Sequence, residues 1–181
     1  MYPFILFAAF VISVPFLEDR PVSGVWTSFH PSASKCIEHS FYFKDKHTLI
    51  EAYNFRATTK QDLDEIYGCE GKILVSLMTI WDYKLQYGKL KRVLKARSLK
   101  VTGSSYIDEW ADKRLCGSDL WKAGSWVLCA HDDLKDIFRL NPLGGNVNYK
   151  TLKDILVLGN NPNQSFFFSK NTRSYLHHIE Y

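Results

Sequence analysis

The sequence lacks the motifs that mark the common catalytic and metal sites. It contains no Gly-x-Ser-x-Gly, no His-Glu-x-x-His, no phosphate-binding loop and no dinucleotide-binding glycine motif. The closely spaced Cys-x-x-Cys pairs of a zinc site are also absent. We therefore expect a protein that is not an enzyme, with no catalytic residue, no metal ion and no cofactor.

A strong excess of either charge is missing as well. The chain has 23 Lys and Arg against 19 Asp and Glu, a formal net charge of +4. This balance is too even to indicate nucleic-acid binding. Aromatic residues, in contrast, make up 15% of the chain, and they favour pleated, half-buried strands. A length of 181 residues is enough for one domain with a substantial core.

Long uncharged stretches are rare, and the main one is MYPFILFAAFVISVPFL at residues 1–17. It has the apolar core of a signal peptide and is shorter than the ~20 residues of a membrane-spanning helix. We predict a signal peptide over 1–17 and a single domain over 18–181. A retained hydrophobic N-terminus is the alternative. No second such stretch follows, so we expect a secreted, extracellular protein without a transmembrane anchor.

Cysteine is limited to four residues. In an oxidising compartment they predict two disulfides, for which three pairings exist. The pairing between sequence neighbours joins Cys36 to Cys69 and Cys116 to Cys129, and we prefer it. The sequon at Asn163 lies in a polar turn and predicts N-glycosylation.

Period-two alternation of apolar and polar residues dominates the chain. In TLIEAYNFRA, for example, Leu49, Glu51 and Tyr53 share one face. A strand is also favoured for KLKRVLKARSLKVTG, with a basic helix as the alternative. One short helix is predicted within SSYIDEWADKRLCG. The other expected strands lie in GVWTSF, HSFYF, GKILVSLMTIWDYKLQYG, SWVLCA, DIFRLN, DILVLG and SFFFSK. These elements predict a mainly β fold: a closed or half-open, lipocalin-like antiparallel β-barrel with one short flanking helix.

The interior of such a barrel is the best candidate for a binding site. In a barrel of about eight strands, the interior is either packed solid or wide enough for one small apolar ligand. A surplus of aromatic and other apolar side chains would then line a cavity for a lipid or fatty acyl chain. The predicted ligand-binding residues are Phe41, Phe43, Tyr53, Phe55, Met78, Ile80, Trp81 and Tyr83.

A basic run forms a second candidate surface. Lys89, Lys91, Arg92 and Lys95 could meet a receptor, a glycan or another acidic partner. The alternative is a solvated edge strand that carries its lysines in water.

Several segments resemble the adenomatosis polyposis coli down-regulated (APCDD) family of secreted Wnt antagonists. SGVWTS resembles the opening Gly-x-Trp strand of that family, and HSFYFKDKHTLIEAYNF resembles its paired strands. LKVTGSSYIDEWADKRLCG followed by AGSWVL resembles the strand, short helix, Cys-Gly and Gly-Ser-Trp order. LVLGNN and TRSYL resemble the closing elements. Together these segments span roughly residues 23 to 176 in the family's order.

The resemblance implies a lipocalin-like barrel that holds an acyl chain, including the lipid carried by Wnt proteins. It therefore implies a Wnt-signalling inhibitor with lipidated Wnt or its receptors as partners. Two alternatives remain. One is a divergent lipocalin that carries free hydrophobic ligands, because Gly24-x-Trp26 also matches the first strand of lipocalins. The other is an interaction module with a solid core that binds through its basic strand.

Overall fold

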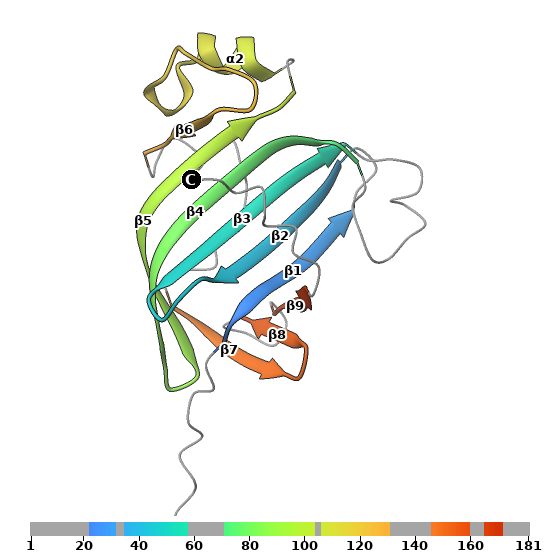
Figure 1. Ribbon diagram of the computed structural model, residues 1–181, viewed down its shortest axis with the longest axis vertical. Helices are drawn as coiled ribbons and strands as arrows, with labels where there is room; N and C mark the ends of the chain where they lie inside the picture. The colour runs from blue at the N-terminus through green and yellow to red at the C-terminus, as the bar shows by residue number, and fades with distance from the viewer. Residues whose placement is uncertain are drawn as a thin grey trace, which may run out of the picture.

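A computed structural model describes residues 22–31, 35–57, 71–103, 106–130, 146–159 and 165–171. Strands dominate it, and they belong to one antiparallel sheet (Figure 1). The long strands are β1 (Gly24–Pro31), β2 (Lys35–Phe43), β3 (Thr48–Ala57), β4 (Ile73–Gln86) and β5 (Lys89–Val101). The short strands are β6 (Trp126–Leu128), β7 (Asn146–Leu152), β8 (Ile155–Leu158) and β9 (Phe166–Asn171).

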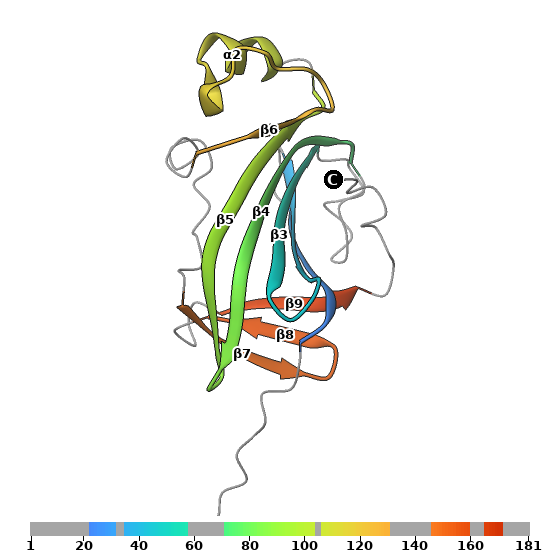
Figure 2. The same ribbon diagram turned by 60° about the vertical axis from the view of Figure 1, so that its left-hand side comes forward.

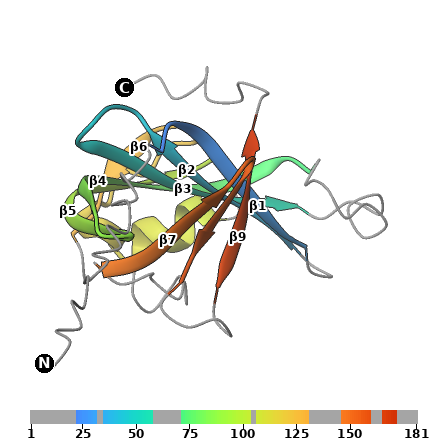
Figure 3. The same ribbon diagram turned by 90° about the horizontal axis from the view of Figure 1, so that it is seen from below.

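The sheet closes into a ring. The strand order is β4-β3-β2-β1-β9-β8-β7-β5-β6, and an additional β4–β5 pairing joins the two sides. The ring is uneven, because β7, β8 and β9 cross one end of the long strands at a steep angle (Figures 2 and 3). The prediction of a mainly β, antiparallel barrel with one short helix is confirmed, although the ring is not an even barrel.

Alternation along the strands explains which side chains point into the ring. Leu49 pairs with Trp81, and Glu51 pairs with Thr79, so these residues share the inner face of β3 and β4. In β5 the register shifts: Trp81 pairs with Leu94 while Ile80 pairs with Ala96. Lys95 is therefore an extra residue in β5. This bulge shifts the alternation by one position, so that apolar side chains on both sides of it point into the ring. KLKRVLKARSLKV is a strand, as expected, and not a helix.

Two hydrophobic clusters fill the ring. The lower cluster joins β1–β5 to β7, β8 and β9, and its members are Val22, Trp26, Phe41, Phe43, Leu49, Trp81, Tyr83, Leu90, Val147, Leu156, Leu158 and Phe168. The upper cluster lies below the helix, and its members are Tyr53, Val75, Leu77, Leu99, Val101, Trp110, Leu115, Trp121 and Cys129. The most buried of these side chains have no accessible surface, and this dense packing accounts for much of the fold's stability.

The helical cap closes the upper end. Helix α2 (Ile107–Asp112) and a 3₁₀ turn (Leu115–Gly117) are shorter than the helix predicted from sequence. The N-cap residue is Tyr106, which makes no side-chain capping bond, so packing of Trp110 against Trp121 holds the helix instead. The Cys116–Cys129 disulfide ties the cap to the chain beyond β6, as predicted.

Some expectations fall on residues that the structure does not describe. The signal peptide, Asn163, Cys69 and the predicted strand DIFRLN lie outside the described residues. Cys36 is disulfide-bonded, but its predicted partner Cys69 is among the residues not described. Within the described part of the chain, no helix combines the length and apolar character needed to cross a membrane.

Candidate functional site

A buried carboxylate occupies the middle of the ring. Glu51 is only 4% exposed. Its Oε1 accepts hydrogen bonds from Nε2 of His39 at 3.0 Å and from the Tyr53 hydroxyl at 3.1 Å. Its Oε2 accepts from the indole N–H of Trp81 at 2.9 Å and from Nη1 of Arg92 at 3.0 Å. Both carboxylate oxygens are therefore satisfied by donors from four different positions, which is what a buried charge requires.

These donors keep Glu51 ionised. Burial alone would raise the pKa of the carboxyl, but the bond from His39, the charge of Arg92 and the bond from Tyr53 outweigh it. The pKa of Glu51 is lowered to about 2. Burial and the adjacent carboxylate raise the pKa of the Tyr53 hydroxyl, which stays a donor.

His39 forms the aromatic side of this cluster. Its ring stacks on Tyr53 with centroids 3.9 Å apart and meets the edge of Phe168 at 5.0 Å. Burial lowers the pKa of His39 despite the favourable contact with Glu51. The imidazole is therefore neutral near pH 7 and acts as a fixed donor to the carboxylate.

Arg92 corrects one sequence-based expectation. The sequence predicts an exposed Arg92 on the partner surface, yet its side chain is 0% exposed and points at Glu51. The guanidinium also lies 4.6 Å from the ring centroid of Trp81. Alternation along β5 is the reason, because Leu90 and Arg92 point inward while Lys91 and Val93 point outward. The buried ion pair fills the centre of the ring, so this level is not an open acyl cavity.

An accessible pocket lies instead at the lower end of the ring, and we call it the hairpin-end pocket. Its volume is about 680 Å³, within the range of small-molecule sites. The apolar part is formed by Val22, Phe43, Tyr83 and Leu85, where the lower cluster reaches the surface. The rest is formed by Ser23, Lys44, Asp45, Lys46, His47 and Lys84.

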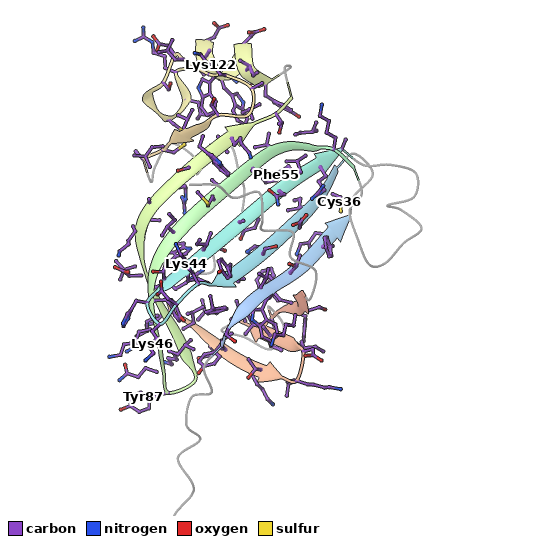
Figure 4. The ribbon with its side chains drawn as sticks, viewed as in Figure 1. Cys36, Lys44, Lys46, Phe55, Tyr87 and Lys122 are labelled. Carbon is purple, nitrogen blue, oxygen red and sulfur yellow. A yellow bond between two sulfur atoms is a disulfide. The ribbon has the colours of Figure 1, made fainter. Side chains whose placement is uncertain are left out.

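The turn between β2 and β3 holds the polar side of this pocket in place. The backbone N–H groups of His47 and Thr48 donate to Oδ1 of Asp45 at 2.8 and 2.7 Å, and these bonds lower the pKa of Asp45. The Tyr83 hydroxyl donates to the carbonyl of Asp45 at 2.7 Å. Lys44 and Lys46, at either side of Asp45, are exposed at this end of the molecule (Figure 4).

The eight predicted ligand-binding residues do not form one site. Phe43 and Tyr83 line the hairpin-end pocket. Phe41 and Trp81 are packed within the lower cluster. Tyr53 is engaged with Glu51, and Phe55 packs against the upper cluster, far from the pocket (Figure 4).

The last two predicted residues, Met78 and Ile80, lie on the opposite face of the sheet. They pair with Ala52 and Ile50, which alternate with the inward-facing Glu51. The expectation that they share a cavity with Phe43 is therefore wrong. Alternation along β4 already places them on the face opposite Trp81 and Tyr83, and the register of β3 on β4 shows that this face lies outside the ring.

The basic run behaves as an outer surface except at Arg92. Lys89 and Lys91 are exposed. Lys95 is also exposed and forms an ion pair with Asp82 at 2.8 Å. Sequence reasoning missed the lysines of the pocket, Lys44, Lys46 and Lys84. The signal for Lys44 and Lys46 was present, because the Lys-Asp-Lys turn follows directly after an aromatic strand.

Comparison with known proteins does not assign a function to this site. No protein-family model matches the chain, and no curated protein sequence matches it. The function must therefore be inferred from the pocket and its chemistry.

Proposed function

We propose that this protein is a secreted, non-enzymatic binding protein whose hairpin-end pocket holds the acyl chain of an amphiphile. The observation that carries the proposal is the composition of the pocket. Its apolar part contains Phe43, Tyr83 and Leu85, and exposed lysines stand beside it. An apolar chain with an anionic head group matches both parts.

The expected affinity follows from burial. Each buried methylene contributes about 0.8 kcal/mol, so eight methylenes contribute roughly 6 kcal/mol before the cost of association. Contacts between lysines and a carboxylate or phosphate add to this. A micromolar dissociation constant, about −8 kcal/mol, is therefore the expected scale.

The natural ligand would be the acyl chain of a lipid-modified extracellular signal. This is the proposal that the resemblance to the APCDD family suggests, with a Wnt protein as the signal and inhibition by sequestration as the outcome. A disulfide between Cys116 and Cys129 supports an oxidising, extracellular setting. A carrier of free fatty acids would use the same pocket, so only the identity of the ligand distinguishes these two functions.

The pocket can be tested with palmitoleate and isothermal titration calorimetry. Leu85→Asp places a charge in the apolar part, where Leu85 is only partly buried, so folding should survive. Leu120→Asp is the matched control, because Leu120 is 76% exposed and lies between the 3₁₀ turn and Trp121. We expect micromolar binding in the wild type and in Leu120→Asp, and at least a tenfold loss in Leu85→Asp.

A second arm separates the two ligands. Immobilised wild-type protein is offered an acylated Wnt protein and the same protein after delipidation. Capture of the acylated form alone supports sequestration of a lipidated signal. Palmitoleate binding without capture of either form supports a fatty-acid carrier. Equal capture of both forms, with no palmitoleate binding, would overturn the acyl-binding proposal.

A further inference from the structure

Two hairpins of the ring project at the same end of the molecule. The β2–β3 turn carries Lys44 and Lys46, and the β4–β5 hairpin carries Tyr87 at its tip (Figure 4). The backbone N–H of Tyr83 donates to the carbonyl of His47 at 2.8 Å. This bond fixes the two hairpins side by side, and the β4–β5 hairpin extends beyond the β2–β3 turn (Figure 1).

Positive charge exceeds negative charge at this end, where Asp45 lies between Lys44 and Lys46. The pair Lys84 and Lys91 lies directly across the two strands, and Lys89 pairs with Gln86 next to it. Like charges opposite each other destabilise a sheet unless something else compensates. Among the described residues, Lys46, Lys84, Lys89 and Lys91 form no ion pair. The nearby carboxylate of Asp82 is paired with Lys95.

The tip of the longer hairpin exposes an aromatic ring. Tyr87 is 76% exposed and adopts a left-handed backbone conformation, with φ of 53°. Gly88 follows with φ of 69°. Asn is favoured over Tyr at the first position of such a turn. The turn therefore carries a large aromatic ring where local backbone preference argues against it.

We propose that this end of the molecule, with Lys46, Lys84, Lys89, Lys91 and Tyr87, docks on the surface of an anionic lipid bilayer. The lysines meet the lipid phosphates and carboxylates, and the Tyr87 ring enters the interface between head groups and acyl chains. This docking goes beyond the proposed function, because it concerns the hairpin surface and does not require the pocket to bind a ligand.

A bilayer fits this surface better than a sulfated glycan does. A sulfated glycan would engage the lysines, whereas a bilayer would also take the exposed Tyr87 ring into its interface. The hairpin-end pocket also has its apolar side chains at the same end as the lysines. Docking would therefore bring Phe43 and Leu85 near the region where acyl chains are available.

The test is co-sedimentation of the whole chain with vesicles of phosphatidylcholine containing 30% phosphatidylserine, compared with pure phosphatidylcholine. Lys89→Gln with Lys91→Gln removes two charges that do not line the pocket. The control, Lys113→Gln with Lys122→Gln, removes the same charge from exposed positions of the cap, where Lys113 pairs with Glu109. Figure 4 labels Lys122. All variants keep both chain termini, so any membrane affinity of the N-terminal apolar stretch is common to them.

We expect the wild type to bind the phosphatidylserine vesicles. Lys89→Gln with Lys91→Gln should lower partitioning about 25-fold, or about fivefold for each lysine. Raising the salt concentration should weaken binding of the wild type. Tyr87→Asn should reduce partitioning by a further factor that salt does not remove, while the control binds as the wild type does.

Equal partitioning of the hairpin and cap variants would overturn the proposal. A second result would also overturn it: the protein binds a heparin oligosaccharide through Lys89 and Lys91 but does not bind anionic vesicles. Palmitoleate titration of the same variants keeps the two proposals apart, because Lys89→Gln with Lys91→Gln should leave the pocket's affinity unchanged whether or not the vesicles bind.

Discussion

Nη1 of Arg92 lies 3.0 Å from Oε2 of Glu51, although the two residues are 41 positions apart in the chain. The pair links β5 to β3 through the interior of the ring, between two hydrophobic clusters. A charge pair at this depth contributes to stability only while both partners are present, because either one alone would be a buried, unbalanced charge.

Glu51→Gln should therefore destabilise the fold by about 3–5 kcal/mol, the usual cost of breaking a buried ion pair from one side. Gln keeps the shape of the side chain, so the loss reports the charge and not a cavity. Urea unfolding followed by tryptophan fluorescence measures it. Asp82→Asn breaks the Lys95 pair, which is about half exposed, and it should cost less than about 1 kcal/mol. Similar losses for the two variants would show that the buried Glu51 cluster contributes no more to stability than an exposed ion pair does.

Stability should fall as the solution is acidified, in two stages. His39 has a lowered pKa in the folded state, so its contribution is complete above about pH 6.5 and declines below it as the unfolded chain takes up the proton. Glu51, with its pKa lowered from 4.5 to about 2, contributes fully above pH 4.5 and loses about 3 kcal/mol as the pH falls through 2.

Urea midpoints measured from pH 2 to pH 8 test this dependence. The wild type should be most stable above pH 6.5, and Glu51→Gln should lose the steep part between pH 4.5 and pH 2. A wild-type stability that rises on acidification below pH 6.5 would contradict the assignment of a neutral, buried His39.

Removing the cap disulfide should affect the cap more than the ring. Cys116 and Cys129 are separated by 13 residues, and a loop of this size corresponds to about 3 kcal/mol. Cys116→Ser with Cys129→Ser should lower the urea midpoint and reduce the near-ultraviolet circular dichroism of Trp110 and Trp121, whose rings pack edge to face. The far-ultraviolet strand signal should remain in the absence of urea. Loss of both signals together would mean that the ring cannot fold without the cap.

Tyr87→Asn should leave the fold as stable as the wild type or stabilise it by a few tenths of a kcal/mol. Asn adopts the left-handed conformation of this turn more easily than Tyr does. Thermal unfolding gives the comparison, and Lys153→Asn provides a matched one, because Lys153 has φ of 52° in the β7–β8 turn. A large destabilisation at position 87 alone would indicate that the Tyr87 ring has a structural role.

The sequence predicted the β-rich fold and most strands from periodicity, the short helix from its capping pattern and the Cys116–Cys129 bond from cysteine spacing. It missed β7, where Val147 and Tyr149 alternate with Asn146 and Asn148. This alternation was readable, but four polar residues weakened the apolar signal. The ring itself, with β7–β9 crossing the lower end, depends on long-range pairings that no local pattern specifies.

The candidate site was harder to predict, because it depends on register and on charge burial. Period-two order groups residues within a strand, but it does not say that Ala52 faces Met78 or that Glu51 faces Thr79. In the same way, the basic run suggested that Arg92 belongs with its lysine neighbours. Arg92 differs from these lysines because alternate residues of β5 point inward and because Glu51, distant in the sequence, pairs with it inside the ring.

β5 changes partners along its length, since residues 89–91 pair with β7 and residues 98–100 pair with β6. Between them, residues 92–96 face no described strand on the side away from β4. In this stretch the 68% exposed Val93 offers an apolar contact for pairing with a strand of another molecule. The bulge and the charge at Lys95 oppose that pairing, so loss of this lysine would show itself as self-association of the protein at high concentration.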